Sequence, residues 1–209
     1  MKIFVTKFAV FQPSPSNPSE SPKLDYVDPL FKRRLSQISR MTIEAVHSLG
    51  NEISDLKLVF ASFRGEIARQ LKINKGLVED ASVMPASFSI SVFNTPPAVA
   101  TIALKLKNGY TAVYPSQKDF YSAFAAASAS VLAHKDEKII FAYGDEYIPE
   151  EYRNCDGYTD ESPLAFACIL SLTPCKECDS KCVEIELDPN NSAFSSPQNF
   201  LKFLQDSSN

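Results

Sequence analysis

The chain has 209 residues, of which 44% are hydrophobic and 22% are charged, a balance typical of a globular protein with a substantial core. Its 21 basic and 25 acidic side chains give a net charge of −4, which argues against a general nucleic-acid-binding protein, since such proteins are usually basic. No apolar run approaches the roughly 18 residues that a membrane span needs, and the first apolar run ends at Lys7, too early for a secretion signal.

The first third of the chain predicts strand, arm, helix and strand. Residues 3–11 are rich in β-branched and aromatic side chains and predict a strand. Five prolines among serines predict an irregular arm over residues 12–30. Apolar residues recur at helical spacing over residues 31–49, where Gly50 ends the pattern, and residues 56–62 are typical of a short buried strand.

The middle of the chain is less regular. A helix is expected from residue 64 to about residue 70, with a second piece to residue 80. Residues 86–93 alternate as a strand would, but the prolines that follow favour a loop. Pro96 and Pro97 fit the first turn of a helix over residues 98–107, which is expected to end at Gly109.

The last part predicts strands at residues 110–116 and 137–143, separated by a helix of mostly small residues over 119–134. Residues 165–172 and 183–187 are predicted to form a hairpin before a closing helix over 196–204. This order predicts an α/β fold with a mixed, mostly parallel five-stranded sheet, helices on its faces and a C-terminal antiparallel pair. We expect residues 1–209 to form a single domain with a Pro/Ser-rich arm at 12–30.

Three sequence strings resemble a known family. They are Lys32-Arg33-Arg34-Leu35-Ser36, Val59-Phe60-Ala61-Ser62-Phe63-Arg64-Gly65-Glu66 and Phe88-Ser89-Ile90-Ser91-Val92-Phe93-Asn94. In this order they are similar to short β-ketoacyl-synthase-like proteins, the chain length factors of type II polyketide and aryl polyene systems. The resemblance covers residues 30 to 173, and the segment 200–204 also fits. It implies the N-terminal half of a thiolase-like fold.

The resemblance also implies that the catalytic groups are missing. A ketosynthase uses a cysteine at a strand-to-helix elbow, where the helix N-terminus lowers the thiol pKa. Counted from Asn94 without gaps, that position falls on Gln117, and a one-residue gap would place it on Lys118. The catalytic histidines of the family come from a C-terminal half that this sequence lacks, and His47 and His134 match no catalytic motif. We therefore expect no condensing activity, no catalytic residue and no cofactor.

A partner protein is implied instead. The resemblance places the strand at residues 110–116 at a dimer interface, which predicts a heterodimer with a catalytic β-ketoacyl-ACP synthase. The candidate acyl-tunnel and interface residues are Phe93, Asn94, Tyr114, Gln117, Lys118 and Phe120. For each of them, ordinary core or interface packing remains an alternative. The basic residues Lys32, Arg33, Arg34 and Arg40 form either a solvated helix face or a docking patch for an acidic acyl carrier protein.

Two further possibilities stay open at this point. The chain could be a purely structural partner of the ketosynthase, or an acyl-transferring enzyme with another nucleophile such as Ser116. The five cysteines, an odd number, predict reduced thiols in a cytoplasmic protein and not a disulfide framework. Cys175, Cys178 and Cys182, with Cys155 upstream, could supply four zinc ligands, but a loop of unligated thiols is the favoured interpretation.

Overall fold

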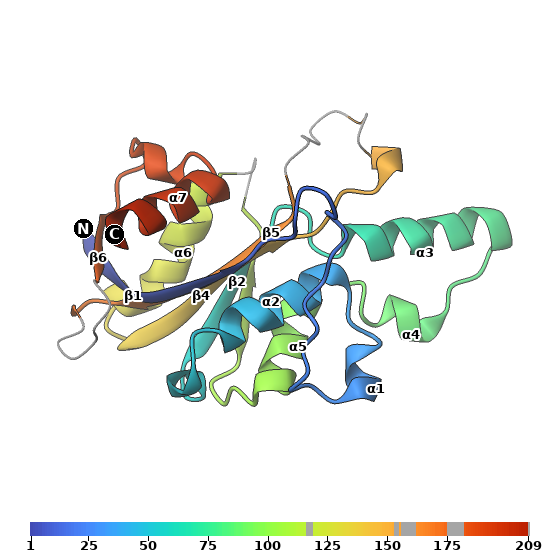
Figure 1. The fold of residues 1–209 in the computed structure, drawn as a ribbon, viewed down its shortest axis with the longest axis horizontal. Coiled ribbons are helices and arrows are strands. Elements are labelled where there is room, and N and C mark those ends of the chain that lie inside the picture. The colour runs from blue at the N-terminus through green and yellow to red at the C-terminus, as the bar shows by residue number, and fades with distance from the viewer. Residues whose placement is uncertain (116–118, 153–154, 156–161, 175–181, 209) are drawn as a thin grey trace.

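The computed structural model describes residues 1–115, 119–152, 155, 162–174 and 182–208. These residues form one six-stranded sheet with helices on both faces (Figure 1). The strands are β1 (Lys2–Phe11), β2 (Lys57–Ala61), β3 (Tyr110–Val113), β4 (Lys138–Asp145), β5 (Leu164–Ser171) and β6 (Val183–Glu186), and they lie in the order β3-β2-β4-β5-β1-β6. This confirms the predicted mixed α/β fold. None of the described helices is both long and apolar enough to pass through a membrane.

The sheet differs from the prediction in strand number and direction. It has six strands, and only β3, β2 and β4 run parallel, whereas β4–β5, β5–β1 and β1–β6 are antiparallel pairs. The predicted C-terminal hairpin is wrong, because β1 lies between β5 and β6 and pairs Phe4 with Ser171 on one side and Ile3 with Ile185 on the other. β5 runs beside β4 in the opposite direction and pairs Ile140 with Ile169.

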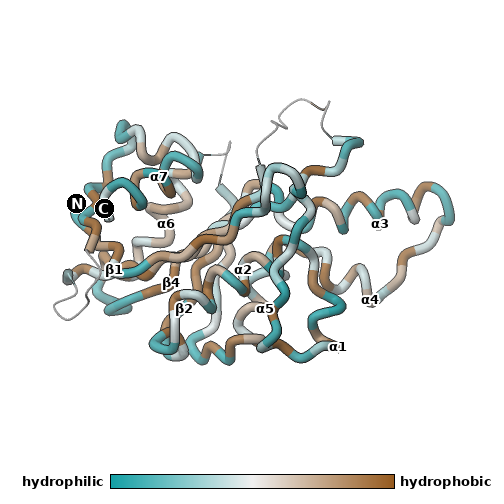
Figure 2. The backbone as a smooth tube through the Cα atoms, in the orientation of Figure 1, coloured by the Kyte–Doolittle hydropathy of each residue, from teal (hydrophilic) through white to brown (hydrophobic). Residues whose placement is uncertain are grey.

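The helices divide between the two faces of the sheet (Figure 1). One face packs against α6 (Phe120–Leu132) and α7 (Pro197–Ser208), and the other against α2 (Gln37–His47) and α5 (Thr95–Leu104). The central strands are hydrophobic along their length (Figure 2), as expected for strands buried on both faces. Side chains of β4 alternate between the two cores: Phe141 faces α6, and Ile140 faces α2.

Three helical segments differ from their predicted bounds. The helix expected over residues 31–49 is two helices, α1 (Pro29–Lys32) and α2, because Asp28 and Ser36 each cap the start of a helix with their side chains. α3 (Ile67–Asp80) is continuous and extends past the expected break. α5 starts at Thr95 and ends before Lys105, whose φ of 55° closes the helix earlier than the expected stop at Gly109.

The alternating segment 86–93 is not a strand. It begins within α4 (Pro85–Phe88), which Pro85 starts, and continues as turns into α5. Together α3 and α4 form an arm, defined here as residues 67–92, that extends away from the sheet (Figure 1).

Candidate functional site

The carboxyl ends of the three parallel strands meet at one end of the sheet, the usual position of sites in open α/β folds. Tyr114 follows β3, the turn 62–66 follows β2, and Asp145 and Glu146 stand at the end of β4. The described residues at this end therefore offer hydroxyl, carboxyl and aromatic groups and the guanidinium of Arg64.

Asp145 organises the turn after β2. Its Oδ1 accepts hydrogen bonds from the Ser62 hydroxyl (2.7 Å) and from the backbone N–H groups of Phe63 (3.1 Å) and Arg64 (3.0 Å). Its Oδ2 accepts from the Tyr143 hydroxyl. Burial raises the pKa of Asp145, while the nearby Arg64 charge opposes that shift. Because Ser62 is completely buried and also accepts from Gly65 N–H (2.7 Å), this cluster holds the turn in place and offers no exposed nucleophile.

This arrangement predicts a loss of stability on removing the carboxylate. Asp145→Ala leaves the backbone N–H of Phe63 and the hydroxyl of Ser62 buried without their carboxylate acceptor, and it should lower the free energy of unfolding by about 2–4 kcal/mol. Asp145→Asn retains a carbonyl acceptor, so its free energy of unfolding should fall clearly less than that of Asp145→Ala. Urea unfolding of both variants measures the difference. Equal losses in the two variants would contradict the assigned role of the acceptor.

Two further buried carboxyls, those of Glu66 and Glu146, fix the start of α3. Glu66 accepts from the hydroxyls of Ser36 (2.7 Å) and Ser39 (2.8 Å) and from Arg69 Nε (3.0 Å). Glu146 accepts hydrogen bonds from the backbone N–H of Ala68 in the first turn of α3 (3.0 Å) and from that of Ile38 in the first turn of α2 (3.4 Å). Burial, followed by the charge of Glu66, raises the pKa of Glu146 to about 8.

Three of the residues predicted for the tunnel and interface lie together beside the edge strand. Phe93 packs edge-to-face on Tyr114, with ring centroids 5.4 Å apart, and Asn94 Nδ2 donates to the hydroxyl of Tyr110 (2.9 Å). The Phe93 ring also lies close to the backbone of Gly65, whose φ is 57°. Only glycine fits there, because a Cβ would lie 2.9 Å from the ring. Tyr114 is 68% exposed, so this aromatic pair is accessible where β3 ends.

Phe120 occupies a different environment. It is 1% exposed, at the start of α6, and its ring contacts those of Phe141, Tyr143, Phe166 and Phe200. The side chain is thus part of the core between α6 and the sheet. Gln117, Lys118 and Ser116 lie outside the described residues.

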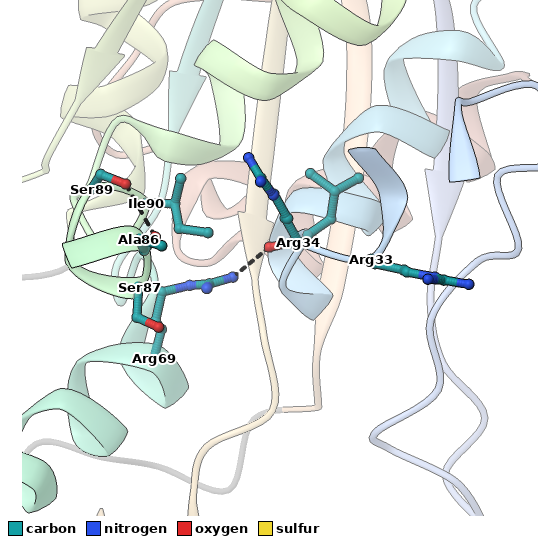
Figure 3. A pocket seen from close by; sticks show the side chains of 8 residues that line it. Arg33, Arg34, Arg69, Ala86, Ser87, Ser89 and Ile90 are labelled. Atoms are coloured by element: carbon teal, nitrogen blue, oxygen red, sulfur yellow. Dashed lines mark hydrogen bonds between the residues drawn. The ribbon is translucent and has the colours of Figure 1, made fainter. Parts of the chain in front are cut away.

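The predicted carrier-docking cations separate into two kinds. Lys32 Nζ donates to the backbone oxygen of Lys23 (2.7 Å), and Arg40 donates to that of Lys32 (3.0 Å), so both bind their own chain. Arg33 and Arg34 are exposed and line a pocket of about 310 Å³ beside α4 (Figure 3).

In that pocket the guanidinium groups point in different directions, and Arg69 donates to the carbonyl oxygen of Arg34 (2.9 Å; Figure 3). The pocket therefore presents positive charge without converging donors.

The histidines and the described cysteines considered as catalytic or metal-binding residues lie in separate segments of the fold. His134 follows α6 and lies with Lys138 at the start of β4, at the end of the sheet opposite the carboxyl ends of the parallel strands. His47 ends α2 and stacks on Tyr26. Of the four cysteines considered as zinc ligands, Cys175 and Cys178 lie outside the described residues, Cys155 is exposed and Cys182 is half-buried. No group of three or more potential ligands occurs within the described ranges.

The comparisons with known proteins are consistent with this geometry. The model of the beta-ketoacyl synthase N-terminal domain matches residues 10–206. A search of curated protein sequences finds no match. Among solved structures, the chain resembles the ketosynthase ApeO in complex with its chain length factor ApeC from Xenorhabdus doucetiae, with a TM-score of 0.70, 22% identity, and coverage of 83% of this chain and 80% of that one.

Two more distant structures share the fold. The ishigamide ketosynthase/chain length factor gives a TM-score of 0.65 at 10% identity, over 82% of this chain and 62% of that one. The ketosynthase of module 6 of the bacillaene synthase from Bacillus subtilis 168 gives 0.55 at 10% identity, over 82% of this chain but only 37% of that one. With a family match over nearly its whole length, the chain belongs to the beta-ketoacyl synthase N-terminal domain family.

Proposed function

We propose that this chain is a non-catalytic ketosynthase-like subunit, a chain length factor, that pairs with an active β-ketoacyl-ACP synthase and shapes its acyl tunnel. The observation that carries the proposal is the position of β3 at the edge of the sheet, with the half-buried Phe93 and the exposed Tyr114 packed together at its end. An edge strand with free backbone groups pairs readily with another chain. Two similar structures contain, by their descriptions, a ketosynthase and a chain length factor.

The proposed mechanism rests on shape. When β3 pairs with a strand of the ketosynthase, the sheet continues across both subunits and brings the Phe93–Tyr114 pair to the interface. Aromatic volume at that point limits the space available to a growing acyl chain. Counted along the sequence from Asn94, the position of the family's cysteine falls on Gln117, or on Lys118 with a one-residue gap, and neither side chain is an acyl-accepting nucleophile.

We assign the carrier-protein contact to Arg33 and Arg34. They are exposed, whereas Lys32 and Arg40 donate to backbone oxygens of their own chain. An acyl carrier protein is acidic, and exposed guanidinium groups attract such a partner at long range.

Truncation of Phe93 tests chain-length control. In the reconstituted complex, Phe93→Ala is expected to lengthen the product by at least one extension unit, because it removes the aromatic ring beside Tyr114. Mass spectrometry of the released chains measures the shift. Phe203→Ala, which truncates a half-buried phenylalanine of α7, is the control. An unchanged product with weaker assembly would favour the purely structural role instead.

A further inference from the structure

The arm of residues 67–92 contributes little to the core of its own chain. Within α3 only Ile67 is buried, and within α4 no residue is. Figure 1 shows α3 extending away from the sheet, with α4 returning below it. Such a helix gains little from packing within its own chain, although tertiary packing normally supplies most helical stability in proteins.

The arm nevertheless exposes large hydrophobic side chains. Eleven described residues of this kind are exposed, and five of them lie between residues 77 and 92. They are Leu77, Val78, Met84, Phe88 and Val92. Scattered exposed apolar residues need no explanation, but a group concentrated in one projecting element is typical of a protein–protein contact.

This apolar surface is grooved and continues toward the edge strand. Phe88, Val92 and Phe93 line a pocket of about 320 Å³ against Ile73 of α3. A second pocket, of about 430 Å³, joins Ile73, Val83 and Met84 to charged side chains of α3 that include Lys72 and Glu79. Phe93 in turn packs on Tyr114, directly after β3. The exposed surface therefore runs from β3 along the arm.

Interface size indicates why the arm is needed. β3 has four residues and is about 13 Å long, so pairing along its edge buries far less than the roughly 1,200–2,000 Å² of a stable interface. Among the described residues, the arm carries five of the eleven exposed large hydrophobic side chains, and these can supply the remaining area.

We propose that the arm of residues 67–92 is the second half of the ketosynthase-binding interface and holds an apolar surface of the partner in the groove that Phe88, Val92 and Phe93 line. This inference rests on the proposed function, since it takes the ketosynthase that pairs with β3 as the occupant. Backbone pairing at β3 sets the register between the two chains, and the arm supplies the hydrophobic area.

Charge substitutions on the arm test the inference. Val78→Glu and Phe88→Glu alter side chains that are 87% and 59% exposed, so the fold of the free chain should tolerate them. A charge buried in the complex without a partner should weaken binding to the ketosynthase from the same gene neighbourhood by at least about tenfold, measured by calorimetry. Leu30→Glu, at a 70% exposed leucine of α1, is the matched control and should bind as the wild type does.

The outcomes separate the two proposals. If the wild-type chain binds the ketosynthase and both arm variants bind equally well, the role of the arm is overturned and the proposed function stands. If the wild-type chain binds no ketosynthase, the proposed function itself fails. If the arm variants only convert a self-associated form into monomer, the occupant is a second copy, and the assignment to the ketosynthase is wrong. Circular dichroism of each variant verifies that the fold is retained.

Discussion

Phe120→Ala is expected to lower the free energy of unfolding by about 3–5 kcal/mol, the range for a phenylalanine truncated inside a packed core. Phe120 is 1% exposed, and its ring centroid lies between 5.3 and 6.2 Å from those of four other aromatic rings. The substitution leaves a cavity between α6 and the sheet, whose rigid strands cannot close it. Urea unfolding of the purified chain gives the loss directly.

Phe93→Ala provides the comparison, because its ring is half-buried beside the edge strand. Phe93→Ala should lower the free energy of unfolding by less than half as much as Phe120→Ala does. A loss below about 1 kcal/mol for Phe120→Ala would contradict its placement in the core. The difference also decides which truncation reports on chain length: a product change in the Phe120 variant would be mixed with unfolding, whereas the Phe93 variant keeps the fold.

The secondary structure was largely predictable because local patterns determine it. Strands such as residues 3–11 and 137–143 are hydrophobic runs without turn residues, and their positions are confirmed within a few residues. The order of the strands in the sheet could not be predicted from local patterns. The insertion of β1 between β5 and β6 joins residues more than 150 positions apart, and no local pattern encodes such a pairing.

The candidate site could be predicted only where its residues lie in neighbouring segments of the chain, before α5 and along β3. Phe93 contacts Tyr114, and Asn94 contacts Tyr110, because the segment before α5 lies beside β3. Whether Phe120 faced a tunnel or the core depended on the rotation of α6 against the sheet, which only tertiary packing sets.

The buried carboxyls at the strand ends were not identified from the sequence. Acidic residues after a buried strand, as in Tyr143-Gly144-Asp145-Glu146, are usually solvated, and the donors that hold them come from distant segments. The available signal was their position at the carboxyl end of a parallel strand.

Glu146 is expected to make stability fall as pH rises. Its pKa is about 8 in the folded chain against about 4.5 when unfolded, so the folded state holds the proton more tightly between those values. The stabilisation is fully present below pH ~4.5 and is lost as pH rises to about 8. Linkage gives a total of about 4–5 kcal/mol over this window. Glu66 faces the group and adds to the shift, whereas Arg69 and the two helix N–H donors oppose it.

Glu146→Gln isolates this contribution, because the amide carries no charge at any pH. Its NH₂ must face one of the two backbone donors, which costs stability equally at all pH values. The informative quantity is therefore the slope: the stability of the variant relative to wild type should improve from pH 5 to pH 8 and then stay constant. Glu52→Gln, at an exposed glutamate, should leave the wild-type slope unchanged. Parallel pH profiles for wild type and Glu146→Gln would show that Glu146 is ionised in the folded chain, with the N-termini of α2 and α3 outweighing its burial.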